Sequence, residues 1–400
     1  MKSKVVIVGA GVSGLFAAYK LLEAGIGVDL YDHSSGVGKK FLVAGKGGLN
    51  LTHSEERDEF IKNYEGHEEL FSSLISEFSP DDLISFCKGL SVETFVGSSG
   101  RVFPKELTAA HMLRNWLDAL RQYSNFNLFL NHRLVSLQKV DEAFNLDFLS
   151  LESKKEISIS SNIVVMGLGG KSWKKTGSDG SWVKLINRLG LEISPFLSMN
   201  CGYEAKWPDS LKAMLDHDPL KNVSIFGKKG ELMLTPFGVE GGLIYAFSKK
   251  IQKEIIDNGE FALEIDLRPD SSFDELKNSL SNKRLKDSRG NQLRKSLKLT
   301  KVESLLLKET LSKEHYFSDE KVACSLKSFK ITLFKARPID EAISSSGGIK
   351  FSEVSDSLES KKHLGLYFMG EMLDWDAPTG GYLFQGCFSS AYRVVKSILS

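Results

Sequence analysis

The sequence predicts an α/β protein in which a parallel sheet is assembled from both ends of the chain, around a mixed insertion. A short β-branched run near the N-terminus, KVVIVGAG, ends in glycines and leads into a helical pattern. Two similar strand-to-glycine segments occur much later, at Val164–Trp173 and Phe368–Tyr392. The composition changes near Ser194-Pro195, where the expected insertion begins.

The chain opens with an expected β-α-β unit. Lys4–Gly11 is typical of a buried strand, Ser13–Gly25 carries apolar residues at helical spacing, and Ile26–Asp32 is a second strand. These strands should pair in parallel through a right-handed crossover. Glu56–Lys88 is expected to be largely helical, with a break at Ser79-Pro80.

The middle of the chain alternates between strands and one amphipathic helix. Val92–Leu107 predicts strand, turn and strand, and Thr108–Tyr123 predicts the helix. Phe126–Val140 and Ala143–Ser150 alternate as antiparallel strands do. Ser161–Gly170 is expected to be another buried strand that ends in glycines.

The insertion and the C-terminal part have different patterns. Residues 194–261 suggest short strands and turns, 271–316 are helical and basic, and 329–351 are extended again. Gly365–Glu371 is an expected strand, and Gly381–Leu399 the last helix. The expected domains are therefore residues 1–193 with 335–400, and an insertion at 194–334. Within it, a β-rich part covers about 194–268 and a helical part about 269–320.

Composition excludes several classes of protein. With 52 basic and 51 acidic residues the net charge is +1, so no global field favours nucleic acid or an anionic membrane. Four scattered cysteines form no Cys-x-x-Cys pair, so we expect reduced thiols, a cytoplasmic location and no metal site. The N-terminal apolar run is interrupted by glycines, which disfavours a secretory signal, and no run is long enough to span a bilayer.

The first glycine cluster has the spacing of a dinucleotide-binding turn. Gly9 permits a tight turn, Gly11 lets the backbone approach a pyrophosphate, and Gly14 lets helix and strand pack closely. The phosphates would face the start of the helix, at Val12 and Ser13, where free N–H groups favour an anion. Asp32 ends the second strand, where a carboxylate accepts from the ribose hydroxyls and mildly disfavours a 2′-phosphate. The motif alone does not decide between FAD and NAD.

A second glycine-rich segment, KKFLVAGKGGLNLTH at Lys39–His53, favours a flavin. Glycines let main-chain N–H groups approach a flat ligand closely, and Asn50 and Thr52 add side-chain partners. Later, Gly380 and Gly381 precede a helix whose N-terminus would stabilise the negative charge of a reduced flavin. The alternative is an exposed, flexible loop.

Taken together, these segments resemble the BaiN/YhiN-type, aminoacetone-oxidase-like family of FAD-dependent flavoproteins, and most closely a less-characterised subgroup. The resemblance covers nearly the whole chain and rests on the following segments: VVIVGAGVSGLFAAYKLLEAG, GKKFLVAGKGGLNLTHSE, SSGRVFPKELTAAHMLRNWL, GGKSWKKTGSDGSW, GELMLTPFGVEGGLIYAFS and GLYFMGEMLDWDAPTGGYLFQGCFSSAY. It implies a glutathione-reductase-type FAD/NAD(P)-binding Rossmann-like domain, with a β-barrel-like and a helical part in the insertion.

The expected FAD-binding residues come from these glycine motifs and from the resemblance. They are Gly9, Gly11, Val12, Ser13, Gly14, Asp32, Lys40, Gly45, Gly47, Asn50, Leu134, Val135, Gly167, Gly169, Gly370, Glu371, Gly380, Gly381 and Tyr382. Glu371 would reach the ribityl chain.

Three positions depart from the family pattern. Gly48-Leu49-Asn50 stands where the family has Arg-Cys-Asn, and Gly167-Leu168-Gly169-Gly170 stands where it has Ala-Thr-Gly-Gly. Leu383 follows Thr-Gly-Gly-Tyr where the family has Asn. These changes are compatible with FAD binding, but the roles of the missing side chains do not transfer.

Residues that could do chemistry each have a structural alternative. Arg101 and Lys46 could bind an anion or be surface cations, and His53 could relay a proton or be structural. Cys387 and Cys201 could be redox thiols or small buried residues.

The acidic and aromatic residues near the C-terminus leave similar alternatives. Asp374 and Asp376 could act as an acid–base pair or belong to a turn ahead of Pro378. Trp173, Trp375 and Tyr382 could line a substrate cleft or belong to the core.

We therefore expect an FAD-dependent oxidoreductase of a small molecule, with NAD(P)H as a transient reductant; its catalytic residues are not identified. A flavin-bound interaction or RNA-associated protein is the alternative, prompted by the basic run Lys283–Lys301, which lacks interleaved aromatic residues. A solvated helix face explains that run as well, so nucleic acid is not an expected partner. An NAD-only dehydrogenase is a third hypothesis.

Overall fold

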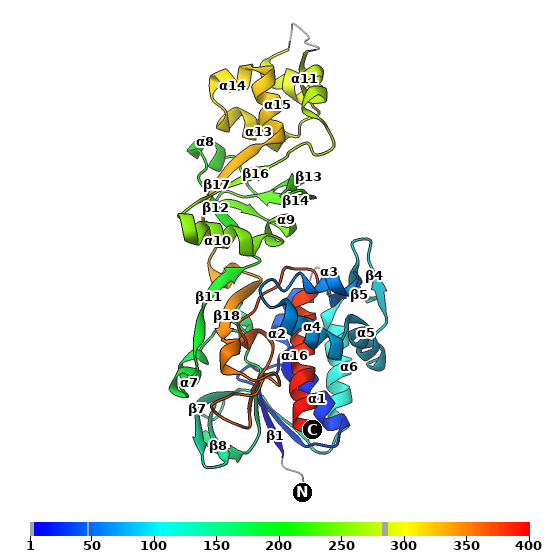
Figure 1. Ribbon diagram of the computed structural model, residues 1–400, viewed down its shortest axis with the longest axis vertical. Coiled ribbons are helices and arrows are strands. Elements are labelled where there is room, and N and C mark those ends of the chain that lie inside the picture. Colours follow the sequence, from blue (N-terminus) through cyan, green and yellow to red (C-terminus); the bar gives the residue numbers. More distant parts are fainter. Residues whose placement is uncertain (1–3, 46–47, 107, 282–286) are drawn as a thin grey trace. The chain divides into compact units, whose positions relative to one another are not determined.

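The computed structural model describes residues 4–45, 48–106, 108–281 and 287–400. The chain forms two compact units, one made of Met1–Leu197 with Ile343–Ser400 and the other of Ser198–Ala342 (Figure 1). The domain boundaries drawn from the sequence, at 193/194 and 334/335, stay a prediction.

The first unit is centred on a parallel sheet with the order β19-β10-β1-β2-β6 in the described residues. Its strands are β1 (Val5–Val8), β2 (Val28–Tyr31), β6 (Phe126–Phe129), β10 (Val164–Met166) and β19 (Leu366–Phe368). Strands from residues 5–31 thus pair with strands from 164–166 and 366–368. This confirms the predicted parallel sheet built from both ends of the chain.

The first unit also contains helices. They are α1 (Val12–Glu23), α2 (Lys39–Ala44), α3 (Arg57–Ile61), α4 (Glu68–Glu77), α5 (Pro80–Gly89), α6 (Ala109–Arg121), α7 (Val183–Arg188) and α16 (Tyr382–Leu399). Helices α1 and α16 pack through Phe16 and Phe388, whose ring centroids lie 5.0 Å apart. The predicted break at Ser79-Pro80 is a helix start, because Ser79 caps α5 through a reciprocal bond with Asp82.

Three further small sheets occur in the residues that the structure describes. One contains β3 (Thr52–His53), β5 (Arg101–Pro104) and β4 (Thr94–Val96), and another contains β7 (His132–Val140), β8 (Ala143–Ser150) and β9 (Glu156–Ser161). The third pairs β11 (Ile193–Met199) with β18 (Ser344–Ile349).

The second unit has an antiparallel sheet of order β13-β14-β15-β12-β17-β16. Its strands are β12 (Tyr203–Ala205), β13 (Asp218–Ile225), β14 (Lys228–Leu234), β15 (Gly238–Glu240), β16 (Phe261–Ile265) and β17 (Phe329–Ala336). A bridge between Ser224 and Asp266 joins the two outer strands, so the sheet curls toward closure. Its helices are α8 (Asp209–Lys212), α9 (Gly242–Tyr245), α10 (Ser248–Asn258), α11 (Phe273–Ser281), α12 (Arg289–Ser296), α13 (Lys301–Thr310), α14 (Lys313–Phe317) and α15 (Asp319–Lys327).

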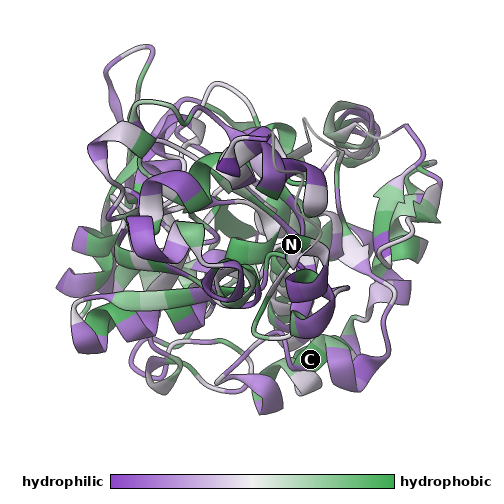
Figure 2. Cartoon of the chain, turned by 90° about the horizontal axis from the view of Figure 1, so that it is seen from above, coloured by the Kyte–Doolittle hydropathy of each residue, from purple (hydrophilic) through white to green (hydrophobic). Residues whose placement is uncertain are grey.

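Several helices carry both hydrophobic and hydrophilic residues, as helices with one face on a core must (Figure 2). The buried side chains form one apolar cluster in each unit. None of the helices in the described part of the chain has the length and apolar character needed to cross a bilayer.

The structure corrects three sequence expectations. Phe126–Val140 is not one antiparallel element, because Asn131 has a φ of +57° and separates β6, in the parallel sheet, from β7. The second glycine segment begins as helix α2, and the β-rich part of the insertion contains helix α10. Local residue preferences did not predict α2 or α10, because tertiary packing can override such preferences.

Candidate functional site

A cavity of about 470 Å³ opens in the first unit, and most of the expected cofactor residues line it. The expected residues found there are Gly9, Gly11, Val12, Ser13, Asp32, Lys40, Asn50, Gly167, Gly169, Glu371, Gly380 and Gly381. They come from segments that are far apart in the sequence. The parallel sheet brings these segments together because they follow the carboxyl ends of neighbouring strands.

The three glycines of the first turn have different surroundings. A Cβ added to Gly14 would lie 1.8 Å from the Gly9 carbonyl oxygen, so helix α1 and strand β1 need glycine there. Gly9 has a φ of +110°, which favours glycine. A Cβ at Gly11, by contrast, would meet no atom within 4 Å and would extend into free space beside the cavity.

The start of α1 presents free backbone donors to this cavity. Its N-cap, Gly11, makes no side-chain capping bond, and the first turn contains no acidic residue. Asp32 accepts hydrogen bonds from the backbone N–H groups of Ala10 and Ser34, both at 2.7 Å. The carboxylate therefore fixes the glycine turn as well as lining the cavity.

Lys40 and Glu371 form an ion pair in the cavity wall. Lys40 Nζ lies 2.8 Å from Glu371 Oε2 and donates to Ser172 Oγ at 3.0 Å. The ion pair links α2, which follows the first β-α-β unit, to the segment after β19. Two expected cofactor residues thus hold each other in position across 331 residues of sequence.

Two buried polar atoms on the cavity wall have no hydrogen-bond partner in the described residues. They are Asn50 Oδ1 and Ser178 Oγ. Buried polar groups are nearly always satisfied, so such a pair indicates donors and acceptors supplied by a ligand. Asn50 is one of the cofactor residues expected from the sequence, whereas Ser178 is not.

Ser178 belongs to a wall segment with Trp173, Thr176 and Gly177, of which only Trp173 is a candidate from the sequence. Trp173 has a φ of +63° and Gly177 one of +103°, so the chain turns sharply there. The quoted segment GGKSWKKTGSDGSW already contained these residues, but their contact with the cavity depends on the tertiary fold.

The start of helix α16 forms another part of the wall. Its N-cap, Gly381, has a φ of +96° and makes no side-chain capping bond, and the first turn has no acidic residue. A Cβ at Gly381 would lie 2.5 Å from Thr52 Cα, so glycine allows β3 to pass directly against the helix start. This helix of 18 residues directs its positive dipole end toward the cavity.

The other expected cofactor residues do not line the cavity. Gly14, Gly45 and Gly370 are packing positions, where an added Cβ would meet Gly9, Ala109 and Ser13 respectively. Leu134 and Val135 lie in β7. Gly47 lies outside the described residues, as does Lys46.

Tyr382 also does not line the cavity. Its hydroxyl donates to Glu55 Oε1 at 2.6 Å, and its carbonyl accepts from Tyr64 at 2.7 Å. Burial, followed by the bond to Glu55, raises the pKa of Tyr382 far above its ordinary value. The phenol is therefore a fixed donor rather than an acid near neutral pH.

His53 is held by the backbone. Its Nε2 lies 2.9 Å from the Ser99 carbonyl oxygen, and its Nδ1 lies 3.2 Å from the Glu55 N–H nitrogen. Because the carbonyl must accept and the amide must donate, Nε2 is the donor and Nδ1 the acceptor in these two contacts. Both ring nitrogens are occupied, which fits the structural alternative for His53.

Arg101 lines the cavity and is partly buried. No hydrogen bond or ion pair joins its guanidinium group to another residue in the described part of the chain. It thereby differs from Lys40, whose charge is balanced by Glu371.

Cys387 and Cys201 fit the alternative of small buried residues rather than redox thiols. Burial raises the pKa of Cys387, in the cavity wall, to about 12, and that of Cys201 also to about 12. Both thiols are therefore protonated at neutral pH and poor nucleophiles.

Asp374 accepts from Ser194 Oγ, and Trp375 is buried and donates to the Gly370 carbonyl oxygen at 2.8 Å. Neither belongs to the cavity wall, whereas Trp173 does.

Relatives of this chain are oxidoreductases or RNA-modifying enzymes by name. It is 23% identical over 409 residues to the 3-dehydro-bile acid delta(4,6)-reductase of Clostridium scindens, covering 98% of this chain and 97% of the relative. It is also 23% identical over 412 residues to the ribosomal RNA dihydrouridine synthase of Haemophilus influenzae, covering 99% and 98%.

Solved structures share the fold at low identity. The 3-ketosteroid-delta4-(5alpha)-dehydrogenase from Rhodococcus jostii RHA1 matches with a TM-score of 0.55 and 13% identity, over 100% of this chain and 97% of that one. The open conformation of a flavocytochrome c3 fumarate reductase matches with a TM-score of 0.53 and 14% identity, over 100% and 78%.

The model of the HI0933-like protein Rossmann domain family matches residues 3–397. The match confirms the resemblance found from the sequence and the predicted Rossmann-like fold. With its parallel sheet, its glycine turn and a family match over nearly its whole length, this chain belongs to the HI0933-like Rossmann family.

Proposed function

We propose that this protein transfers hydride between NAD(P)H and a small organic molecule through FAD held in the cavity of the first unit. Its class is that of the FAD-dependent oxidoreductases, and its cofactor is FAD. The nicotinamide reductant and the small-molecule substrate are the proposed part.

The residues of the cavity fit such a cofactor. The observation that carries this fit is the pair of unpartnered buried atoms, Asn50 Oδ1 and Ser178 Oγ, beside two uncapped helix starts. An extended dinucleotide with phosphates and a polar ring edge supplies partners for both kinds of group.

Each part of the cavity has a distinct task in this proposal. The N–H groups at the start of α1 would hold the pyrophosphate, and Asp32 would accept from the ribose. Asn50 would donate to or accept from the ring edge, and the start of α16 would favour negative charge there. Bound FAD supplies the hydride chemistry.

The alternative of an RNA-associated protein draws support from the name of the Haemophilus influenzae relative. The basic run that prompted it is partly neutralised in the structure. Arg289 pairs with Asp319 at 2.7 Å, and Lys295 pairs with Asp287 at 3.0 Å. Residues 282–286 of that run lie outside the described residues.

The test begins with the absorbance of the purified protein. We expect flavin bands and release of FAD on heating, followed by anaerobic bleaching with NADH or NADPH. Gly11→Val should abolish FAD retention without unfolding the protein, because its side chain enters free space at the phosphate turn. Gly89→Ala, at an exposed helix end where an added Cβ also meets nothing, is the matched control and should retain FAD.

A colourless protein that takes up no FAD would refute the proposal. Retained FAD that no nicotinamide reduces, together with tight RNA binding by the same preparation, would favour the RNA-associated alternative.

A further inference from the structure

We infer that Arg101 binds an anionic oxygen group of the substrate, and that the substrate is a largely apolar molecule carrying a carboxylate. This inference rests on the proposed function and extends it to the class of substrate. Arg101 lines the cavity, yet no described carboxylate balances its charge. An unpaired, partly buried guanidinium group is costly unless a ligand completes it.

The fold places Arg101 beside the start of α16. His53 is its register partner in the β3–β5 pair, and the His53 ring stacks on Tyr382 with centroids 5.7 Å apart. The preceding residue of β3, Thr52, touches Gly381 through its backbone. The guanidinium group therefore lies near the positive end of the helix dipole, and both favour an anion in the same part of the cavity.

The carboxylate of Glu55, which binds Tyr382, already accepts hydrogen bonds from other residues. Glu55 Oε1 accepts from the Tyr382 hydroxyl at 2.6 Å and from Asn63 Nδ2 at 3.2 Å. Both donors are neutral groups, and no ion pair joins Glu55 to Arg101 in the described residues. The arrangement leaves the guanidinium group free to form a bidentate contact with a carboxylate.

Several contacts hold the turn before Arg101 in place. The His53 ring bonds to the Ser99 carbonyl oxygen, and the Gly97 N–H donates to the Arg101 carbonyl oxygen at 2.8 Å. Gly100 packs so closely on His53 that an added Cβ would lie 2.5 Å from the ring. His53 is therefore a positioning residue for the turn that carries Arg101.

Apolar side chains form much of the remaining wall. Leu383 and Phe384 lie in the first turn of α16, and Val43, Ala44 and Ile343 join them on the cavity wall. Such apolar residues around the guanidinium group of Arg101 fit a carboxylate carried on an apolar body.

The test uses the FAD-loaded protein and benzoate as probe, with the change in flavin absorbance as readout. We expect saturable benzoate binding to the unchanged protein. Arg101→Gln should weaken it roughly 10- to 100-fold, as expected when a charge-assisted hydrogen bond is lost. Arg101→Lys should recover part of the affinity, because it restores the charge without the fork geometry.

Two controls isolate the charge at this position. Lys105→Gln removes a positive charge just after β5 from an exposed pair with Glu93, and should leave benzoate binding unchanged. Benzamide, which has the same shape without the charge, should bind all variants equally weakly.

Benzoate binding that is absent from the unchanged holoenzyme, or equal in Arg101→Gln, would overturn the inference. Failure of the proposed function is a different result, since it appears as a protein that holds no FAD or is not reduced by NAD(P)H. Thermal unfolding of Arg101→Gln should match that of the unchanged protein, so a folding defect would be recognised separately.

Discussion

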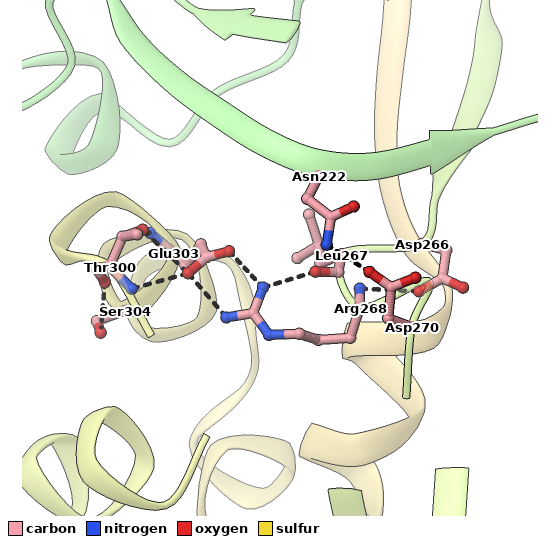
Figure 3. A network of polar contacts seen from close by, with 8 residues as sticks. All are labelled: Asn222, Asp266, Leu267, Arg268, Asp270, Thr300, Glu303 and Ser304. Atoms are coloured by element: carbon pink, nitrogen blue, oxygen red, sulfur yellow. Dashed lines mark hydrogen bonds and ion pairs between the residues drawn. The ribbon is translucent and has the colours of Figure 1, made fainter. Parts of the chain in front are cut away.

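Two sets of polar groups, one in each unit, differ in how far their hydrogen bonds and charges are satisfied. In the second unit, the Glu303 carboxylate accepts two bonds from Arg268, at 2.5 and 2.9 Å, and two from Thr300 (Figure 3). Arg268 Nη1 also donates to the Leu267 carbonyl oxygen at 2.6 Å. In the cavity of the first unit, Asn50 Oδ1, Ser178 Oγ and the Arg101 guanidinium group have no described partner.

The satisfied groups contribute to stability, whereas the unsatisfied groups in the cavity wall are available for function. Glu303 pairs with Arg268 and also forms the capping box of α13 with Thr300, so neither of its carboxylate oxygens is left over for a ligand. The cavity groups carry a cost in the folded protein that only a ligand removes. Polar groups that stay unsatisfied in the wall of a cavity therefore point to a binding site.

The largest predicted effect comes from breaking the satisfied network of Arg268 and Glu303. Arg268→Ala should lower the free energy of unfolding by about 3 kcal/mol, because Glu303 would remain as a buried charge without its partner. Denaturant unfolding measures this, while FAD content should not change. Lys206→Ala breaks an exposed pair with Glu260 in the same unit and should cost less than about 1 kcal/mol. Equal losses in the two variants would contradict the contrast drawn here.

A smaller effect is expected from the unsatisfied groups. Ser178→Ala and Asn50→Ala should change the stability of the FAD-free protein by less than about 1 kcal/mol, since neither removed atom has a described partner. Each should weaken FAD binding roughly tenfold, which is about 1.4 kcal/mol. Titration of FAD-free protein with FAD measures this, with the exposed Ser160→Ala as control. A stability loss like that of Arg268→Ala would mean that these groups are structural.

The smallest effect concerns acid stability. Burial acts to raise the pKa of Glu303, but the hydrogen bonds from Arg268 and Thr300 outweigh it, so its pKa lies below the ordinary value. A lowered pKa in the folded state adds stability that is complete above the unfolded pKa of about 4.3. This stability is lost as pH falls through the lower, folded-state pKa. Measuring the unfolding of the second unit at a series of pH values should show this loss of stability in acid. The loss should be smaller in Arg268→Ala. If the variant loses as much stability in acid as the unchanged protein, Glu303 is not the source of the loss.

Much of the site could be predicted because it follows local rules. Gly9, Gly11, Gly14 and Asp32 are fixed by a β-α-β unit whose spacing is visible in the sequence. Tyr382 was placed among the cofactor residues, but its hydroxyl bonds to Glu55, 327 positions away in sequence. No local pattern encodes such a pairing.

The sequence by itself determined the parallel sheet, the glycine turn and the family, because hydrophobic period and turn chemistry act over a few residues. Only the tertiary structure decided which polar groups are satisfied. It pairs Lys40 with Glu371 and leaves Arg101 and Ser178 without partners in the described residues. The physical reason is that charge compensation depends on distances between side chains from distant segments, and these distances exist only after folding.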